Sequence, residues 1–359
     1  MRSAKGTLYK LDDGRWRVMV EAGRDPKTGK RTRRTKTVRG SRKRAEAVKA
    51  AMLVEIGDPE QAREDMTVDE FWGAVYHPHC EKTVRDNTLA GYESKYHVHV
   101  EGPLGGMLLR RITPPVVRRW LDGIDGDGRK FQAYKLLRQM LRYAVRMDLL
   151  DSDPTAHVET PKTRRYRFET LTAGQARAYL AHFRRDDVDN RAELAVLLAL
   201  GGGLTRSEML GLRWDDITPD GAVTVDNGVT SAHGKSVDND PKNEFRVRRV
   251  HLPASVAERV DELRGDGWVF QNSRGGRLDP DKLSSIYGKE RGKLPEDIPR
   301  IPLKNLRHTS LTLALESGVD LLAVSRRAGH SSVSTTANFY LRPHEQVDID
   351  AASKLDSLF

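Results

Sequence analysis

The sequence has little of what several common classes of protein need. Its single cysteine, Cys80, excludes an internal disulfide and fits a reducing compartment. The longest apolar run, residues 194–204, is too short and too rich in glycine to cross a membrane. No apolar core follows the first basic residues, so we expect no secretory signal. Neither a GxxxxGKS/T phosphate loop nor an HExxH zinc motif occurs, and we expect no cofactor.

Two short segments in the middle of the chain are rich in residues that can ligate metals: His77, His79, Cys80, His97 and His99. Their spacing, H-P-H-C followed by H-V-H, fits no regular structural zinc pattern. We therefore interpret them as core and surface side chains and predict no metal site.

Positive charge is abundant and unevenly distributed. The chain holds 61 Lys and Arg against 51 Asp and Glu, a net charge of +10. Residues 1–49 alone hold 17 basic and 5 acidic residues, a net +12, so the other 310 residues sum to −2. This concentration predicts a polyanionic partner that binds mainly at the N-terminal segment.

The first segment, residues 1–60, predicts a small three-stranded sheet followed by a helix. Apolar residues alternate with polar ones from Trp16 to Val20, which is typical of a half-buried strand, and two turn sequences flank this strand. A helix follows, with Ser41 as its N-cap and Gly57 as its stop. The alternative is a disordered basic tail, against which the strand alternation and Trp16 argue.

The second segment, residues 65–160, predicts helices. Thr67 and Glu70 form a capping box, and Thr88 and Thr113 are expected to open two more helices. The clearest helix is expected from Lys130 to Leu149, with an apolar face made of Phe131, Tyr134, Leu137, Leu141, Ala144 and Val145. Four basic residues recur on it at steps of three and four: Lys135, Arg138, Arg142 and Arg146. In a generic protein a solvated helix face would explain this basic stripe equally well.

A basic, proline-bearing linker without apolar periodicity is expected at residues 158–167. The third segment, residues 165–359, predicts a helix after Thr172, a buried helix within residues 193–200 and strands within 222–252. Its last stretch, 345–359, predicts an amphipathic tail. The chain as a whole is expected to be a multidomain α+β protein.

Cationic residues of the third segment recur around a lone tyrosine near the C-terminus. Lys304, Arg307 and His308 form one cluster, a Gly-His pair ends at His330, and Tyr340 follows ten residues later. A phenol that attacks a DNA phosphate forms a phosphotyrosine and expels a sugar hydroxyl, and arginines stabilise the charge on the phosphate oxygens. This pattern therefore suggests phosphodiester chemistry without a metal.

In these motifs, and over essentially its whole length, the chain resembles the tyrosine recombinases, specifically the integrases of temperate phages and integrative elements. The resemblance implies catalytic roles at the following positions: Arg206 in LTRSEMLGLRW and Arg307 in KNLRHT as the two arginines, Lys242 in PKNEFRVRRVHLP as the β-hairpin lysine and candidate general acid, His330 in AGHSS as the histidine, and Tyr340 in TTANFY as the nucleophile. Lys304 stands where the family usually has histidine, and a lysine cannot be a neutral base near pH 7.

Each of these residues also has an ordinary structural interpretation. Arg206 lies in a capping box, Thr205 to Glu208, that could be purely local structure. Tyr340 could pack as an amphipathic tyrosine, and His330 could be a helix-end residue. Their occurrence together and in this order favours the catalytic interpretation, whereas His308 is interpreted as structural support.

The resemblance also implies a domain organisation. Residues 1–60 correspond to the arm-type DNA-binding domain, 65–160 to the helical, SAM-like core-binding domain, and 165–359 to the mostly helical catalytic domain with a small sheet. The implied DNA contacts in the first domain are Arg15, Arg17, Lys30, Arg31, Arg33, Arg34 and Lys36. Beside a recombinase active site, phosphate contact also becomes the better explanation of the basic stripe.

The implied activity is integration and excision of a mobile element by a homotetramer on double-stranded DNA, in the bacterial cytoplasm and associated with the nucleoid. A DNA-bending host factor and an excision factor are implied partners, and no membrane is involved. The C-terminal tail is expected to dock either on its own domain or on a neighbouring protomer. A resolvase, a transposon recombinase or a topoisomerase of the same chemistry, and a non-catalytic DNA-binding protein, remain alternatives.

Overall fold

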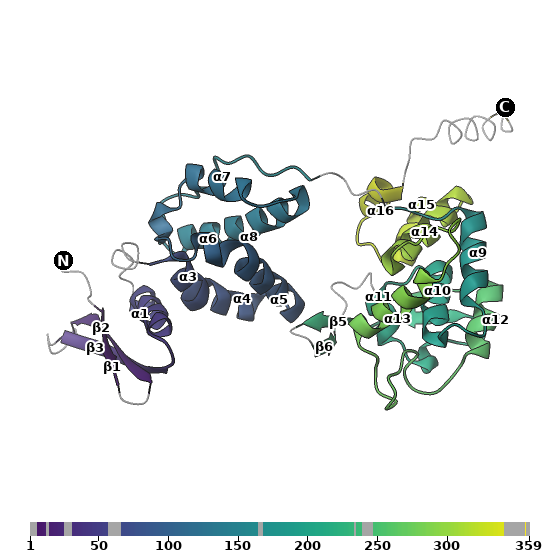
Figure 1. The fold of residues 1–359 in the computed structure, drawn as a ribbon, viewed down its shortest axis with the longest axis horizontal. Coiled ribbons are helices and arrows are strands. Elements are labelled where there is room, and N and C mark those ends of the chain that lie inside the picture. The colour runs from purple at the N-terminus through teal and green to yellow at the C-terminus, as the bar shows by residue number, and fades with distance from the viewer. Residues whose placement is uncertain are drawn as a thin grey trace. The chain divides into compact units, whose positions relative to one another are not determined.

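The computed structural model describes residues 6–11, 14–24, 31–56, 66–163, 168–232, 235–238, 247–340 and 356. The chain divides into two compact units, Met1–Tyr166 and Arg167–Phe359. Figure 1 shows the helices and strands of both, most of them labelled. The expected α+β architecture, mostly helical with small sheets, is confirmed. In the described part of the chain, no helix is long and apolar enough to cross a membrane.

The first unit begins with an antiparallel sheet in the order β1-β2-β3, made of Gly6–Lys10, Arg15–Arg24 and Arg31–Arg39. Helix α1, Arg42–Ile56, lies against it (Figure 1). Val18 and Val20 are fully buried, as their alternation predicted, and Trp16 donates its indole N–H to the carbonyl of Gly40 at 3.1 Å. The backbone N–H of Arg44 donates to the hydroxyl of Ser41, which confirms the predicted N-cap.

The helical part of the first unit consists of two long helices, each with a π-helical turn, followed by two more helices. Residues 68–83 and 86–104 form the two interrupted helices: α3 (Val68–Phe71), η1 (Trp72–Tyr76) and α4 (His77–Thr83), then α5 (Asp86–Lys95), η2 (Tyr96–Glu101) and α6 (Gly102–Leu104). The π turns face each other, since the rings of Trp72 and Tyr96 stack at 4.1 Å. A short turn, η3 (Leu109–Arg111), precedes α7 (Pro114–Asp122) and α8 (Asp127–Arg146).

Three predicted features of these helices can be compared directly. The capping box at Thr67 and the helix start at Thr113 are confirmed. The start predicted at Thr88 is wrong, because α5 begins two residues earlier at Asp86, where an acidic side chain in the first turn favours the helix dipole.

Helix α8 lies three residues earlier than predicted. It follows Gly126, whose φ is +84°, and ends at Arg146 because Asp148 adopts φ +53° and the N–H of Leu149 donates back to the carbonyl of Ala144. Its buried face is Ala133, Tyr134, Leu136, Leu137, Met140, Leu141 and Ala144. Phe131 and Val145, predicted for that face, are only partly buried.

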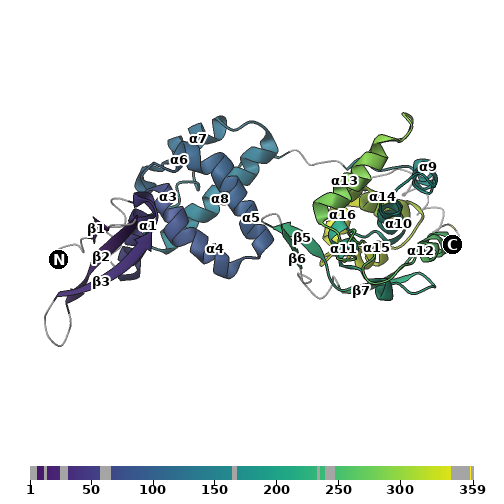
Figure 2. The same cartoon turned by 60° about the horizontal axis from the view of Figure 1, so that its bottom comes forward.

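The second unit is built around α10, Asn190–Gly202, which is buried along nearly its whole length. It contacts its helical neighbours α9 (Ala173–Phe183), α11 (Arg206–Gly211), α12 (Ala254–Glu262), α13 (Pro280–Gly292) and α14 (Leu303–Glu316) (Figure 2). The helix start predicted at Thr172 is confirmed, and the structure adds that Thr172 is the N-cap of a capping box with Gln175. The buried core of this unit thereby fixes helices that are far apart in the sequence.

The strands of the second unit form two separate pairs. Strand β4 (Ala222–Val225) pairs with β7 (Arg248–His251), while β5 (Val229–Ala232) and β6 (Lys235–Asp238) form a hairpin. The short turn η4 (Trp214–Asp216) precedes β4, and α15 (Leu321–Ala328) and α16 (Val333–Tyr340) complete the unit. Both of these last helices contact α14. The predicted C-terminal tail lies outside the described residues, apart from Asp356.

Candidate active site

Arg307 lies on α14 and is held by the ends of two other helices. Its Nη1 donates to the carbonyl of Gly203 at 2.7 Å, and its Nη2 donates to the carbonyl of Ala328. Gly203 and Gly329 are the left-handed C-caps of α10 and α15, so these carbonyls lie at helix C-termini, where the helix dipole is negative. The guanidinium is largely buried, and these two acceptors are neutral.

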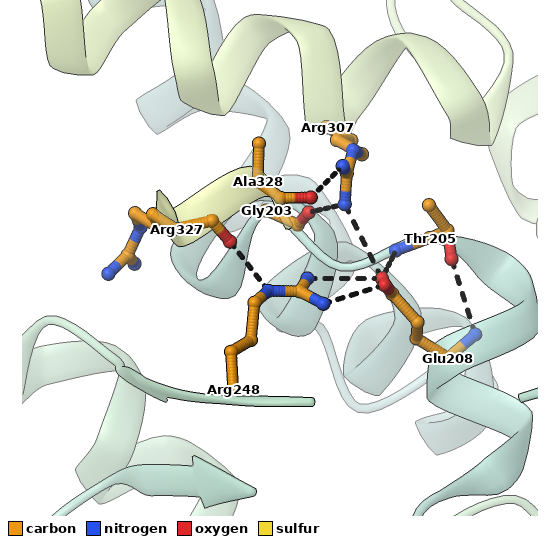
Figure 3. A network of polar contacts seen from close by, with 7 residues as sticks. All are labelled: Gly203, Thr205, Glu208, Arg248, Arg307, Arg327 and Ala328. Atoms are coloured by element: carbon orange, nitrogen blue, oxygen red, sulfur yellow. Dashed lines mark hydrogen bonds and ion pairs between the residues drawn. The ribbon is translucent and has the colours of Figure 1, made fainter. Parts of the chain in front are cut away.

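Glu208 joins two buried arginines in the network that Figure 3 shows. Its Oε1 accepts from Nη1 of Arg248 at 2.8 Å, and its Oε2 is 3.4 Å from Nη1 of Arg307. The same Oε2 accepts the backbone N–H of Thr205 at 2.8 Å, which completes the predicted capping box. Burial raises the pKa of the Glu208 carboxyl, but Arg248 and Arg307 lower it more, and the net pKa is below its ordinary value. Glu208 is therefore charged at neutral pH.

The Arg248 guanidinium also contacts the segment that carries Arg327. Its Nε donates to the carbonyl of Arg327 at 2.7 Å, and its side chain is only 7% exposed. The Arg327 side chain in turn donates to the carbonyls of His251, at 3.0 Å, and Gly201. Burial, with a contribution from Arg248, lowers the pKa of Arg327. These contacts tie strand β7 to helices α10 and α15.

Gly329 allows this close approach. Its φ is +67°, and a Cβ at this position would lie 3.0 Å from Nη1 of Arg248. A residue other than glycine would therefore be strained in its backbone and would press on the arginine.

Arg206 begins α11 and turns toward α13. Its Nη1 donates to Oγ of Ser284 at 2.6 Å and to the carbonyl of Pro280 at 3.2 Å, and lies 3.6 Å from a carboxylate oxygen of Asp281. The side chain is 40% exposed. Arg206 is thus anchored at one end and accessible to a ligand.

Arg307, Lys304 and His330 all lie close enough to His308 to interact with it electrostatically. Burial lowers the pKa of His308 to about 4, and the charges of Arg307, Lys304 and His330 contribute. The imidazole of His308 stacks on Phe168 with ring centroids 3.5 Å apart. This neutral, stacked ring agrees with the structural role predicted for it.

His330 lies between α15 and α16. Its Nδ1 is 2.8 Å from the hydroxyl of the buried Thr336, which orients the ring. The backbone of Tyr340 ends α16, which contacts α14 and α15, but its side chain lies outside the described residues. Lys242 also lies outside them. The structure thus gathers Lys304, Arg307 and His330, and links Arg206 to them through the α11 capping box.

Sequence reasoning missed two members of this site. Glu208 was interpreted only as part of a local capping box, and Arg248 was not singled out. A signal for Arg248 does exist in the sequence, since Val250 and Leu252 are buried and the arginine precedes them at the same two-residue period. An arginine at an inward-facing strand position requires a buried acceptor.

The basic residues predicted for DNA contact in the N-terminal sheet fall on both of its faces. Directly paired residues share a face, so the register places Arg15, Arg17 and Arg33 on the face opposite the buried valines, together with the exposed Tyr9. Arg34 and Lys36 pair with Val20 and Val18 on the other face, although both remain exposed. Lys30 and the side chain of Arg31 lie outside the described residues.

The basic stripe of α8 is accessible. Lys135, Arg142 and Arg146 are exposed, whereas Arg138 is partly buried. Arg146 lies over the ring of Tyr143 at 5.1 Å.

The residues that could have suggested a metal site have other contacts. His77 pairs with Glu93 at 2.7 Å, His79 stacks on Tyr143 at 4.1 Å, and His97 pairs with Glu101 at 2.8 Å. Among the residues that the structure describes, no group of three or more His, Cys, Asp or Glu is suited to hold a metal ion.

Comparison with known proteins places this arrangement in a family. The model of the phage integrase family matches residues 169–346, nearly all of the second unit. The "Tyrosine recombinase XerC-like" protein of Caldanaerobacter subterraneus subsp. tengcongensis is 26% identical over 99% of this chain and 100% of its own length. The chain belongs to the tyrosine recombinase family.

Solved structures of integrases share the fold, among them the following two. The integrase of transposon Tn1549, in complex with transposon right end DNA, gives a TM-score of 0.68 at 20% identity and covers 81% of this chain and 100% of its own. A lambda integrase tetramer bound to a Holliday junction gives 0.61 at 19% identity and covers 94% of this chain and 96% of its own. The second likeness extends over the N-terminal sheet as well as the helical parts.

Proposed function

We propose that this chain is a site-specific DNA recombinase of the phage-integrase type, which integrates and excises a mobile element. The observation that carries the proposal is the gathering of Lys304, Arg307 and His330 beside α16, the helix that ends at Tyr340. A cluster of fixed cations beside a candidate nucleophile is suited to a phosphodiester in its transition state.

In the proposed reaction, the phenol oxygen of Tyr340 attacks a phosphorus of one strand. A 3′-phosphotyrosine bond forms, the bond to the 5′ oxygen breaks, and Lys242 donates a proton to that leaving oxygen. The freed 5′-hydroxyl of the partner duplex then attacks the phosphotyrosine, which releases Tyr340. The number of phosphodiester bonds is conserved, so no nucleotide is consumed.

The remaining site residues bind the phosphate. Arg206 and Arg307 hold its non-bridging oxygens through guanidinium N–H donors, with His330 and Lys304 as further donors. Lys304 acts here as a hydrogen-bond donor, since its charge at neutral pH prevents it from accepting the tyrosine proton. Glu208 keeps Arg307 in place.

The proposed assembly is a homotetramer that pairs two recombination sites. The lambda integrase tetramer on a Holliday junction supports it, because that protein shares the fold over 94% of this chain. We assign residues 1–60 to arm sites, 65–160 to the core site and 165–359 to catalysis. The DNA-bending host factor and the excision factor are proposed on family resemblance. A DNA substrate puts the reaction in the bacterial cytoplasm, at the nucleoid.

Covalent trapping tests the chemistry. A duplex from the DNA that flanks this protein's gene is nicked so that the leaving strand is lost after cleavage, and is incubated with protein and EDTA. We expect a denaturant-resistant protein–DNA adduct with the wild type and none with Tyr340→Phe, and a DNA-linked peptide that contains residue 340. An adduct of undiminished yield with Tyr340→Phe would refute the assignment of the nucleophile.

A further inference from the structure

The contacts that anchor Arg206 lie on one side of its guanidinium. In the described part of the chain, the contacts of Arg206 all involve Nη1, which approaches Ser284, Pro280 and Asp281. The planar guanidinium binds a phosphate in a bidentate manner through two adjacent N–H donors. Fixing Nη1 therefore leaves the Nε and Nη2 edge for the ligand.

Ser284 is the strongest of the three partners. Its Oγ accepts from Arg206 at 2.6 Å and also donates to the carbonyl of Pro280 at 3.2 Å, so both functions of the hydroxyl are used. Asp281 lies farther away, at 3.6 Å, and its side chain is 77% exposed. An exposed ion pair of this kind restrains a side chain little.

The helix that carries Ser284 is itself fixed. Asp279 caps α13 by accepting the backbone N–H groups of Asp281 at 2.9 Å and Lys282 at 3.3 Å, and Pro280 occupies the first helical position. Leu283, next to Ser284, is fully buried in the core of the second unit. The hydroxyl is thus presented from a rigid element rather than from a loop.

We propose that Ser284 is a positioning residue for strand cleavage, which orients Arg206 so that its Nε and Nη2 edge meets the scissile phosphate. This inference rests on the proposed function, in which Arg206 binds that phosphate. Without the hydroxyl, Arg206 samples other rotamers and the phosphate oxygen loses a donor in the transition state. The effect appears in the rate of cleavage rather than in DNA affinity, since many other contacts hold the duplex.

Two substitutions of equal shape separate the hydroxyl from packing. Ser284→Thr keeps the hydroxyl and Ser284→Val replaces it with a methyl group, while both introduce a β-branched residue into α13. Ser285→Val is the control for the branched residue, because Ser285 is the exposed neighbour on the same helix. Single-turnover cleavage of the nicked duplex is measured with the full-length protein at saturating DNA.

We expect Ser284→Val to cleave about 10- to 100-fold more slowly than Ser284→Thr, the scale of a misplaced catalytic group, with DNA affinity and melting temperature alike in the two variants. A duplex with a neutral methylphosphonate at the scissile position lacks one charged phosphate oxygen. The difference in cleavage rate between Ser284→Val and Ser284→Thr should therefore be smaller on this duplex. Equal cleavage rates for Ser284→Val and Ser284→Thr would overturn the inference. A rate difference of the same size on the normal and the methylphosphonate duplex would also overturn it, because it would indicate a structural role for Ser284.

Arg206→Ala in the same assay distinguishes the two possible failures. If Arg206→Ala is inactive while Ser284→Val matches Ser284→Thr, the recombinase assignment stands and the role of Ser284 is wrong. If Arg206→Ala cleaves like the wild type, the proposed site itself is wrong.

Discussion

Replacing Glu208 with glutamine should destabilise the second unit markedly. The substitution keeps the shape of the side chain and a capping-box acceptor for Thr205, but it removes the negative charge between Arg248 and Arg307. Breaking a buried ion pair at one partner costs about 3–5 kcal/mol. Because glutamine retains one oxygen acceptor, we expect the lower end, about 3 kcal/mol. For a unit of this size that corresponds to a fall in melting temperature of about 6–12 °C.

The loss of stability in Glu208→Gln should also depend on pH, and it should be smaller in acidic solution than at neutral pH. The folded-state pKa of Glu208 lies below its ordinary value of 4.5, so the charge stabilises the fold fully above that value. The contribution is lost as the pH falls through the folded-state pKa. The difference between wild type and Glu208→Gln should therefore be constant from about pH 7 to pH 5 and should narrow in more acidic solution.

Differential scanning calorimetry of the full-length protein at several pH values measures both effects. Glu258→Gln is the matched control, because Glu258 is exposed on α12 of the same unit. A Glu208→Gln variant that melts within about 1 °C of this control would refute the argument, since a buried charge cannot be removed from two arginines at so small a cost. A difference that stays constant in acid would show that the charge is not its source.

Three further predictions follow from individual side chains. In urea unfolding, Gly329→Ala should destabilise the second unit by about 1 kcal/mol or more beyond the effect of Gly318→Ala. Both glycines have positive φ, but only a Cβ at position 329 would press on Arg248. Equal losses of stability in the two variants would contradict this. His308→Phe should keep the stacking on Phe168 and abolish a pH-dependent loss of stability. Because the His308 pKa is lowered to about 4, the wild type should lose stability relative to the variant as the pH falls from about 6.5 to 4. A His308 imidazole that titrates above pH 6.5 by NMR would refute this prediction. The third prediction concerns the exposed residues of the α8 stripe, which are Lys135, Arg142 and Arg146. Replacing them with glutamine should reduce the slope of log affinity against log salt concentration by about 0.9 for each DNA phosphate that the variant no longer neutralises. An unchanged slope in binding titrations would exclude these residues from the DNA interface.

The sequence predicted those features that depend on neighbouring residues. The capping boxes at Thr67 and Thr205 were visible because their partners lie three residues away. The ion pair between Glu208 and Arg248 spans forty residues, and no local pattern encodes it. The predicted C-terminal boundary of α8 was wrong because the helix end depends on the left-handed conformation of Asp148. An aspartate can adopt this conformation, but its presence in the sequence does not predict it.

The roles of the site residues are a different kind of prediction. Motifs singled out Arg206, Arg307 and His330, and the structure shows which groups hold each of them. Sequence spacing could not supply the partners of Arg206 and Arg307, because they come from α13, from the ends of other helices and from Glu208. Their part in catalysis remains a prediction until cleavage is measured.

The way in which the cations are held bears on how the site can act on DNA. Arg307 donates to the carbonyls of Gly203 and Ala328, and the carboxylate of Glu208 that it approaches is shared with Arg248. A carbonyl fixes a guanidinium without cancelling its charge, so the site keeps a positive potential for a phosphate. The low pKa of His308 responds to that potential, because nearby cations add to the effect of burial. Carboxylates in place of these two carbonyls would have stabilised the free protein and weakened its attraction for the transition state, so holding Arg307 by carbonyls is itself consistent with phosphodiester chemistry.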